Sequence, residues 1–362
     1  MEHIKFKSLY TQVEESVLQP AKPMGELILR ADITELEAQL CAYIGAPHCV
    51  GVLNATSGLI MALRAAGVGQ GDLVLCTSFG FFAVRQVVEL LGGRAILVDL
   101  NPNSWTVDPY CLEYVIGRLK REKQPLPKAL VAVDLFGLPC DYTALEEICG
   151  RFNIALIEDM SQAMGGNCKG VKAGNFGRFA VTSFFPGRTL GESGGGAVFC
   201  RTPEDARQLA LMRGEEKAGE TFIKQSVAAT LVTESLKRFD EECARRQAVA
   251  ARYDKNLKGI VRLQKIGEGY QSARNQYAVL LRDKNTRDYV FEGLSQMEIP
   301  CRIYAPEQAL QGALERAVLQ NAQSIADRIL TLPMHPHLTG NLVEYVSASV
   351  AELVWKREEA EK

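Results

Sequence analysis

Thr182-Ser-Phe-Phe-Pro-Gly-Arg-Thr-Leu-Gly-Glu-Ser-Gly-Gly-Gly196 is the stretch that decides the fold of this chain. It leads from one apolar strand to the next through a glycine-rich turn, with Arg188 near its centre. Ser183 and Arg188 lie at or just after a predicted strand end, and Asp159 follows the preceding strand in the same way. Ligands of parallel sheets bind beyond the carboxyl ends of the strands. The stretch therefore predicts an α/β fold with a ligand site at this place.

Apolar strands alternate with helices along most of the chain. Continuous apolar strands separated by helices of ten or more residues indicate a mostly parallel sheet covered on both faces. The strands are predicted at 49–53, 73–76, 95–99, 129–134, 154–158 and 196–200, with helices at 32–44, up to 66, up to 91, near 108–120, near 142–152 and up to 213.

Three segments are predicted along the chain. An N-terminal segment at 1–30 precedes a large domain at 31–240, and the linking helix and a small C-terminal α/β domain occupy 241–362. A chain of 362 residues is too long for one small core, so a large and a smaller domain are expected. A strand at 276–281 and a last helix near 341–357 outline the small domain.

The composition favours a soluble protein that works on small molecules or protein partners. The net charge of -2 gives no general attraction to nucleic acid or to an anionic membrane. No stretch approaches the apolar length of a membrane span, and the N-terminus lacks a signal-peptide core, so we expect a cytoplasmic protein. The 10 cysteines show no paired spacing and are predicted to be reduced, packed thiols, and the 4 histidines predict no metal site.

A turn of small residues, Asn54-Ala-Thr-Ser-Gly58, joins the first strand to an apolar helix. Backbone N–H groups at such a helix start are unpaired, and the helix dipole favours an anion there, so a phosphate can dock. The same pattern also describes a well-capped helix that binds nothing. By pattern alone, Phe79, Phe81 and Phe82 equally fit a core, and Asp159 fits a helix cap.

Several motifs together resemble the DegT/DnrJ/StrS family of sugar aminotransferases, which use pyridoxal phosphate (PLP). The resemblance covers roughly residues 30 to 355 and implies the PLP-dependent transferase fold of type I, with a large and a small domain. Its motifs are Thr77-Ser-Phe-Gly-Phe-Phe-Ala83, Ile157-Glu-Asp-Met-Ser-Gln-Ala-Met-Gly165, Ser183-Phe-Phe-Pro-Gly-Arg188, Leu190-Gly191 and Gly195-Gly-Ala197.

The resemblance assigns cofactor-binding roles to six residues. It implies that the turn at the start of the first apolar helix binds the cofactor phosphate, that an aromatic ring stacks on the pyridine ring, and that an aspartate pairs with the protonated pyridine nitrogen. It also implies that a glutamine reaches the phenolic oxygen. The residues are Thr56 and Ser57 for the phosphate, Phe81 for the ring, Asp159 for the nitrogen, Gln162 for the phenolic oxygen, and Ser183 in the same site.

Arg188 stands where the family has the lysine that binds the coenzyme covalently. That bond needs a neutral primary amine, and a guanidinium stays protonated and cannot supply one. Three further positions depart from the family pattern: Arg178 replaces an aspartate, Thr221 falls about where an asparagine binds the neighbouring subunit's phosphate, and Pro306-Glu-Gln-Ala-Leu310 lacks a histidine.

These departures predict a homologue without normal transaminase activity, a pseudoenzyme. It would bind a nucleotide-sugar-like molecule and serve as a ligand-binding or partner subunit in sugar, polysaccharide or secondary-metabolite biosynthesis. PLP or pyridoxamine phosphate (PMP) would bind noncovalently or not at all. The alternative is an active aminotransferase or dehydratase-like enzyme that uses noncovalent PLP or PMP. The resemblance also implies a homodimer, or a heterodimer with a related aminotransferase.

Overall fold

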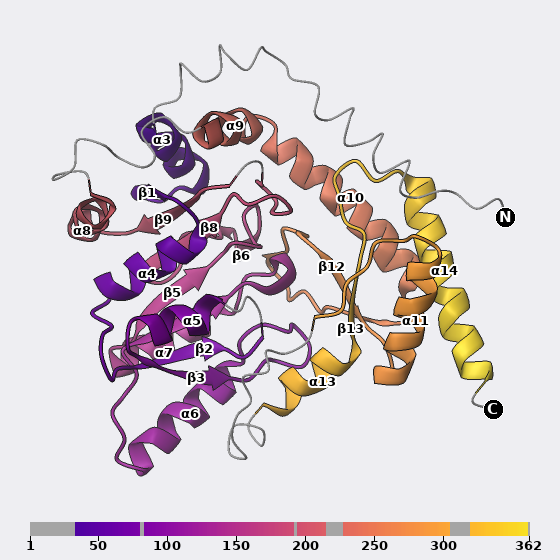
Figure 1. The fold of residues 1–362 in the computed structure, drawn as a ribbon, viewed down its shortest axis with the longest axis horizontal. Helices are drawn as coiled ribbons and strands as arrows, with labels where there is room; N and C mark the ends of the chain where they lie inside the picture. Colours follow the sequence, from indigo (N-terminus) through magenta and orange to yellow (C-terminus); the bar gives the residue numbers. More distant parts are fainter. Residues whose placement is uncertain (1–32, 80–82, 192–193, 215–226, 305–318, 361–362) are drawn as a thin grey trace.

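The computed structural model describes residues 33–79, 83–191, 194–214, 227–304 and 319–360, and its architecture has two parts (Figure 1). The larger part, coloured indigo to magenta in Figure 1, is built on a seven-stranded sheet. The smaller part, orange to yellow, lies beside it. Helix α10 (Phe239–Leu257) leads from the one to the other.

The central sheet is mostly parallel, which confirms the predicted fold class. Its strand order is β1-β9-β8-β5-β4-β2-β3. Only β9 runs antiparallel to its neighbours within this sheet, so its amino end lies at the same edge as the carboxyl ends of the other strands. The strands are β1 (His48–Val52), β2 (Leu73–Thr77), β3 (Arg94–Val98), β4 (Ala129–Val133), β5 (Ala155–Asp159), β8 (Phe179–Ser183) and β9 (Gly196–Cys200).

Helices cover both faces of this sheet because its strands are apolar on both sides. Side chains alternate between the faces along each strand. Val131 packs in one cluster with α4, α5 and α8, while its neighbour Leu130 packs in another with α6 and α7. Helices α3 and α9 cover the face of Leu130 further along the sheet. Their bounds are α3 (Ile33–Ile44), α4 (Ala55–Ala65), α5 (Ala83–Leu90), α6 (Pro109–Arg121), α7 (Tyr142–Phe152), α8 (Pro203–Arg213) and α9 (Val227–Leu236).

The smaller part has its own core around an antiparallel three-stranded sheet. Tyr253 and Tyr277 stack in this core with ring centroids 4.6 Å apart, and both are almost fully buried. The elements are β10 (Arg262–Leu263), β12 (Tyr277–Leu280), β13 (Ile329–Leu332), α11 (Lys284–Gln296), α13 (Gln320–Arg328) and α14 (Gly340–Glu359).

The connection that follows α10 is tied back to the large part. The guanidinium of Arg262 donates to the carbonyl oxygen of Pro102 at 2.9 Å, and Gln264 donates to that of Ser104 at 2.8 Å. A second small sheet holds the same connection through β11 (Tyr270–Gln271), β6 (Asn167–Cys168) and β7 (Val171–Lys172). The two parts are therefore joined by more than the chain itself.

Every strand predicted between 49 and 200 is confirmed, with ends that agree within one residue. The helix predicted to run up to 91 is α5, which is described from Ala83 to Leu90, while Thr77 ends β2 and Ser78 and Phe79 lie in a bend. The domain boundary at 240/241 stays a prediction. Helix α13, far beyond it in sequence, packs in the cluster of α4 and α5.

Within the described ranges, no helix combines the length and the apolar character that a bilayer crossing would need. In the same part of the chain, no three His, Cys, Asp or Glu side chains are grouped so that they could hold a metal ion.

Candidate functional site

The ends of β1, β8 and β5 lie side by side at one edge of the sheet. Ser183, the last residue of β8, pairs with Gly196, and Gly196 pairs on its other side with Val52, the last residue of β1. Asp159, the last residue of β5, pairs with Val181 of β8. The predicted site residues of all three strand ends are thus brought to one edge.

Asp159 and Ser183 also point to the same face of the sheet. Side chains two residues apart on a strand share a face. Ile157 and Val181, two residues before them, both pack in the cluster of α4 and α5. The two polar side chains therefore lie on the face that carries the start of α4.

The start of α4 has the form expected of an anion-binding turn. Asn54 is the N-cap and accepts a hydrogen bond from the backbone N–H of Ser57 at 2.8 Å. Thr56 and Ser57 follow in the first helical turn and are half-buried. The geometry of the turn is therefore compatible with both interpretations of its sequence, a phosphate-binding turn and a well-capped helix that binds nothing.

Glycines hold α4 close to the sheet. A Cβ on Gly58 would lie 2.9 Å from a methyl group of Val181, closer than real Cβ contacts. A Cβ on Gly196 would come within 2.6 Å of the carbonyl oxygen of Thr182 and within 3.0 Å of the Asn54 carbonyl carbon. Only residues without a side chain bring the helix start and the strand ends this near to each other.

Arg188 lies in a compact turn directly after β8. Its backbone N–H donates to the carbonyl oxygen of Phe185 at 3.1 Å, and its own carbonyl accepts from Gly191 at 3.1 Å. The neighbouring Thr189 donates through its hydroxyl to the carbonyl oxygen of Met164 at 3.0 Å. This bond anchors the turn of Arg188 to the segment that follows β5, and the Arg188 side chain is half-buried.

Asp159 is a buried carboxylate under the electrostatic influence of Arg188. Its side chain is 3% exposed and accepts a hydrogen bond from the backbone N–H of Ser161 at 3.1 Å. Burial raises the pKa of Asp159, while the bonds from Ser161 and the positive charge of Arg188 oppose that rise. The structure therefore brings together the two residues on which the sequence interpretation depends.

Gln162 and Ser183 both make internal hydrogen bonds. The side-chain oxygen of Gln162 accepts from the backbone N–H of Phe136 at 2.9 Å. Phe136 has a positive φ of 59°, which bulky residues rarely adopt, so Gln162 supports a strained loop. The hydroxyl oxygen of Ser183 accepts from the N–H of Phe185 at 3.2 Å. Both side chains keep donor groups that could still serve a ligand.

Three positions from the sequence interpretation lie outside the described residues. They are Phe81, Thr221 and the segment 306–310. The expectations for the ring-stacking aromatic, the missing asparagine and the missing histidine therefore stay predictions.

Arg178 lies away from the site. It precedes β8, at the opposite end of the strand from Ser183 and Arg188. Its guanidinium forms an ion pair with the buried carboxylate of Asp205, with nitrogen–oxygen distances of 2.6 and 3.1 Å. The charge of Arg178 is thus balanced at the other edge of the sheet, and it adds nothing to the charge around Arg188.

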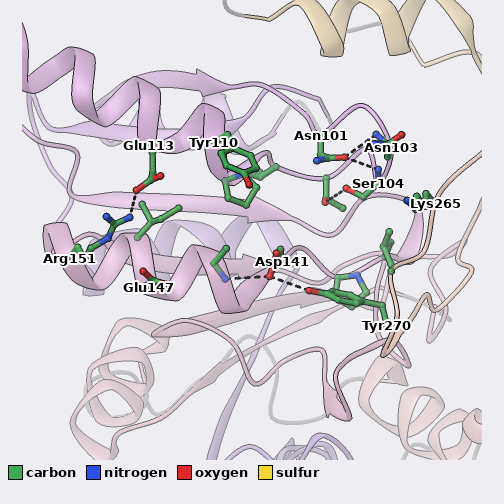
Figure 2. A pocket seen from close by; sticks show the side chains of 18 residues that line it. Asn101, Asn103, Ser104, Tyr110, Glu113, Asp141, Glu147, Arg151, Lys265 and Tyr270 are labelled. Carbon is green, nitrogen blue, oxygen red and sulfur yellow. Dashed lines mark hydrogen bonds and ion pairs between the residues drawn. The ribbon is translucent and has the colours of Figure 1, made fainter.

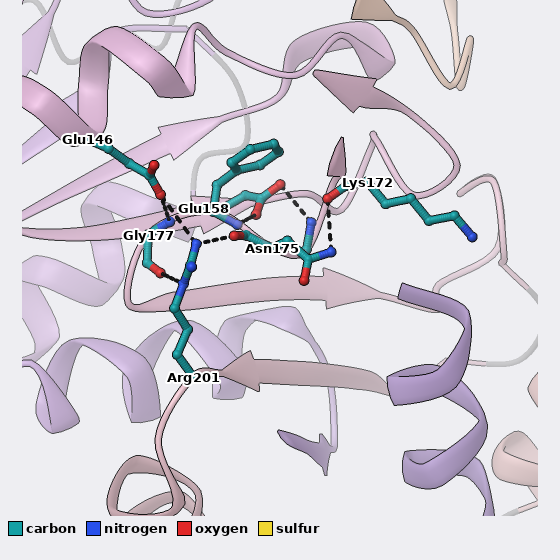
Figure 3. Close-up of polar contacts among 8 residues, drawn as sticks. Glu146, Glu158, Lys172, Asn175, Gly177 and Arg201 are labelled. Carbon is teal, nitrogen blue, oxygen red and sulfur yellow. Dashed lines mark hydrogen bonds and ion pairs between the residues drawn. The ribbon is translucent and has the colours of Figure 1, made fainter. Parts of the chain in front are cut away.

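Sequence reasoning missed a pair of buried carboxyl groups behind the site. Glu158 lies on the other face from Asp159, and its two oxygens accept from the N–H groups of Gly174 and Phe176 at 2.9 and 3.1 Å (Figure 3). Asp134 accepts from the hydroxyl of Tyr142 at 2.8 Å. The sequence did contain a signal for Asp134, because this residue, like Asp159, comes at the end of an apolar run that forms a strand.

These two buried carboxyl groups lie close enough for the charge of each to affect the ionisation of the other. Burial raises the pKa of Asp134 to about 7 and raises that of Glu158 as well. The second oxygen of Asp134 has no hydrogen-bond partner among the described residues. A proton held between the two groups satisfies this oxygen and avoids two adjacent buried charges.

A separate cavity of about 590 Å³ opens on the opposite face of the sheet (Figure 2). Tyr110 and Glu113 of α6, Asp141 before α7 and Tyr270 of the connection line it, and the hydroxyl of Tyr270 donates to Asp141 at 3.2 Å. Helices α6 and α7 belong to the face of Leu130, so the sheet separates this cavity from Asp159.

The sequence profile of the DegT/DnrJ/EryC1/StrS aminotransferase family matches residues 12–351. The chain belongs to this family. The family is PLP-dependent, and the arrangement of β1, β5 and β8 around the edge of the sheet follows its fold.

Named relatives extend over the whole chain. UDP-2-acetamido-2-deoxy-3-oxo-D-glucuronate aminotransferase of Pseudomonas aeruginosa is 31% identical, and the alignment covers 97% of this chain and 99% of that protein. The crystal structure of a DegT DnrJ EryC1 StrS aminotransferase from Brucella abortus superposes with a TM-score of 0.84 at 28% identity, covering 97% and 99% of the two chains.

A second similar structure is of a protein in its PMP form, PMP being the amino form of the coenzyme. The PMP form of the putative sugar aminotransferase Spr1654 from Streptococcus pneumoniae gives a TM-score of 0.80 over 98% of this chain and 96% of that one. At 21% identity, this likeness supports the fold alone.

Proposed function

We propose that this chain binds a nucleotide sugar at the edge formed by β1, β5 and β8 and lacks the lysine-dependent transamination of its family. The observation that carries the proposal is Arg188, a permanent cation in the turn after β8 that acts on the buried carboxylate of Asp159. A guanidinium does not form the covalent bond that holds the family's coenzyme. The chain then works as a ligand-binding or partner subunit in sugar, polysaccharide or secondary-metabolite biosynthesis.

The remaining residues fit a coenzyme that is held without a covalent bond. Asp159 is a buried acceptor of the kind that pairs with a protonated ring nitrogen, and the start of α4 at Thr56 and Ser57 suits a phosphate. Gln162 retains an amide N–H for an oxygen of the ring. When bound, PLP or PMP supplies an electron sink for the substrate carbon and a site for the transferred amino group.

The alternative is an active enzyme with noncovalent PLP or PMP, acting as a sugar aminotransferase or in a dehydratase-like reaction. The retained, buried Asp159 favours it, because this carboxylate serves the ring of a coenzyme better than it serves a sugar. Against it, Arg188 cannot take up and release the proton that must move between substrate and coenzyme, since its guanidinium stays charged.

We also propose a homodimer, or a heterodimer with a related aminotransferase. Two large apolar side chains near the site, Leu53 and Phe185, are 59% and 64% exposed. Leu53 follows β1 and Phe185 follows β8, at the edge that holds Asp159. Exposed apolar groups at a ligand-binding edge support burial against a second chain.

One spectroscopic experiment separates the possibilities. The purified protein is incubated with PLP, and its visible absorbance is recorded before and after borohydride, followed by dialysis. Reversible binding or no binding is expected, together with no amino transfer from glutamate to a keto sugar nucleotide. A borohydride-fixed coenzyme would contradict the loss of covalent binding, and transfer by the wild-type protein would contradict the loss of activity.

A further inference from the structure

Two cysteines that are eight positions apart in sequence meet between α3 and β1. Cys41 lies in the last part of α3, and Cys49 is the second residue of β1. The chain reverses between them at Gly45, which has a φ of 85° and donates its N–H to the carbonyl oxygen of Cys41 at 2.8 Å. Both side chains pack in the apolar cluster under α3. Cys41 lies one helical turn beyond Glu37, and Cys49 lies two residues before Gly51 on the same face of the strand, so the hydrogen bond between Glu37 and Gly51 places the two cysteines opposite each other. The sequence alone predicted only single, packed thiols.

The two thiols have unequal surroundings. Cys41 is half-buried and packs at the margin of the apolar cluster under α3, whereas Cys49 is 8% exposed and lies inside that cluster. Burial raises the pKa of Cys49, and the neighbouring thiol of Cys49 lowers the pKa of Cys41. An accessible thiol that ionises more readily, next to a buried thiol, is the arrangement that reacts with oxidants.

We propose that Cys41 and Cys49 form a redox-active dithiol, which small-molecule disulfides such as glutathione disulfide convert into an intramolecular disulfide. The Cys41 thiolate attacks one sulfur of the glutathione disulfide, forming a mixed disulfide and releasing one glutathione thiolate. The sulfur of Cys49 then attacks Cys41, closes the internal disulfide and releases the second glutathione. The protein loses two electrons and two protons, and the glutathione disulfide gains them.

The position of the pair connects it to the proposed ligand site. β1 runs from Cys49 directly to the Asn54 cap of α4, where Thr56 and Ser57 begin the helix. Helix α3 is already attached to this strand, because the carboxylate of Glu37 accepts the N–H of Gly51 at 2.7 Å. A disulfide would fix α3 to the strand that positions the turn. The pair itself does not depend on any function of that turn.

A third cysteine nearby provides the matched control. Cys200 belongs to β9 and pairs with His48, the residue before Cys49. It therefore points to the opposite face and packs in the cluster of α4. Cys200 shares the neighbourhood of the pair but lies across the sheet from Cys41, so it should not join the disulfide.

The test is peptide mapping of the folded, full-length protein after exposure to glutathione disulfide. Chymotrypsin cleaves after Tyr43, between the two cysteines, so a Cys41–Cys49 bond leaves the two fragments joined without reductant and separate with it. Wild type and Cys200→Ser are both expected to give the joined fragments. A native protein whose fragments stay separate while other cysteines become oxidised would overturn the proposal.

Single variants identify the order of the steps. Cys49→Ser should accumulate the mixed disulfide of glutathione on Cys41, because the resolving thiol is missing. Cys41→Ser should lose both the mixed and the internal disulfide, with Cys49 left reduced. If a variant fails to fold, the wild-type protein still decides the matter through its rate of labelling by a thiol reagent. Cys41 should react first among the cysteines, and a slower Cys41 would refute its role as the attacking group.

Discussion

The guanidinium of Arg188 lies close enough to the buried carboxylate of Asp159 to oppose the effect of burial on its pKa. Asp159 ends β5 and Arg188 follows β8, and the two residues come near each other because β5 and β8 are parallel neighbours that end at one edge. A coenzyme with a protonated ring nitrogen would bring a second positive charge to the same carboxylate. Arg188 thus removes a nucleophile and also competes electrostatically for the partner of the ring.

Replacing the N-cap of α4 should weaken both the stability of the protein and its binding of PMP, and a control at another helix cap distinguishes the two effects. Asn54→Ala removes the acceptor for the Ser57 N–H and should lower the free energy of unfolding by about 1 kcal/mol. Asp283→Ala is the control, since Asp283 caps α11 by accepting from Thr286 at 2.8 Å, far from the site. Urea unfolding should change similarly in both variants, whereas PMP binding should weaken only in Asn54→Ala. Equal PMP binding in the two would argue against a phosphate at this turn.

The close packing of α4 on the sheet can be tested at Gly58. Gly58→Ala places a methyl group 2.9 Å from Val181 in a filled core and should destabilise the protein by about 1–3 kcal/mol. Gly150→Ala, in α7, meets no atom within 4 Å and should be neutral or stabilising by roughly 0.5–1 kcal/mol through helix propensity. Thermal unfolding of both variants decides the point, and similar melting temperatures would contradict the tight approach.

Much of the fold could be predicted because its signals are local. Each strand of the central sheet is a short apolar run with a turn or helix start after it, and this pattern depends on neighbours in sequence. The edge position of Asp159 and Ser183 could be predicted because a strand end fixes where its last side chain lies. Parallel strands then place such ends at one edge without any knowledge of their contacts.

Other features depend on contacts between distant residues and could not be predicted in this way. The ion pair of Arg178 with Asp205 and the coupled ionisation of Asp134 and Glu158 join residues more than twenty positions apart. Sequence spacing does not reveal such pairs. Arg178 is recognisable in sequence only as a departure from the family pattern, and the structure shows that its partner is a carboxylate on α8 at the other edge of the sheet.

The Asp134 and Glu158 pair predicts an unusual pH dependence. The folded pKa of Asp134 is about 7, above its ordinary value of 3.8, so the folded state holds a proton that the unfolded chain has lost. The contribution of this proton to the free energy of unfolding is therefore complete below pH 3.8 and is lost as the pH rises through 7. Asp134→Asn keeps the shape without the ionisation and should flatten the stability curve in this window.

Urea unfolding at several pH values between 4 and 8 measures this slope, with about half-unit steps being sufficient since a titration spans roughly two units. Glu204→Gln, an exposed acid on α8, serves as the control and should keep the wild-type slope. A wild-type protein whose stability rises with pH across this range would show that the pair holds no proton.

Arg188→Lys should restore at most weak covalent attachment of the coenzyme and little amino transfer. The variant returns the amine, and Asp159 and Gln162 remain to orient the ring, so some attachment is expected. We expect the phosphate to have fewer partners than the family provides, because the resemblance places Thr221 about where the family has an asparagine. The coenzyme should therefore bind loosely, and the new amine would hold it only part of the time.

Two measurements are made on the variant and on wild type. One is the visible absorbance with PLP, and the other is the rate of amino transfer from glutamate to a keto sugar nucleotide. Arg188→Gln is the matched control: it removes the charge without supplying an amine, so tighter PMP binding with no covalent product would isolate the electrostatic effect on Asp159. Equal PMP binding in Arg188→Gln and wild type would mean that the guanidinium does not compete for this carboxylate. Activity in Arg188→Lys at the level of an ordinary family member would mean that the arginine is the only defect in an otherwise complete site.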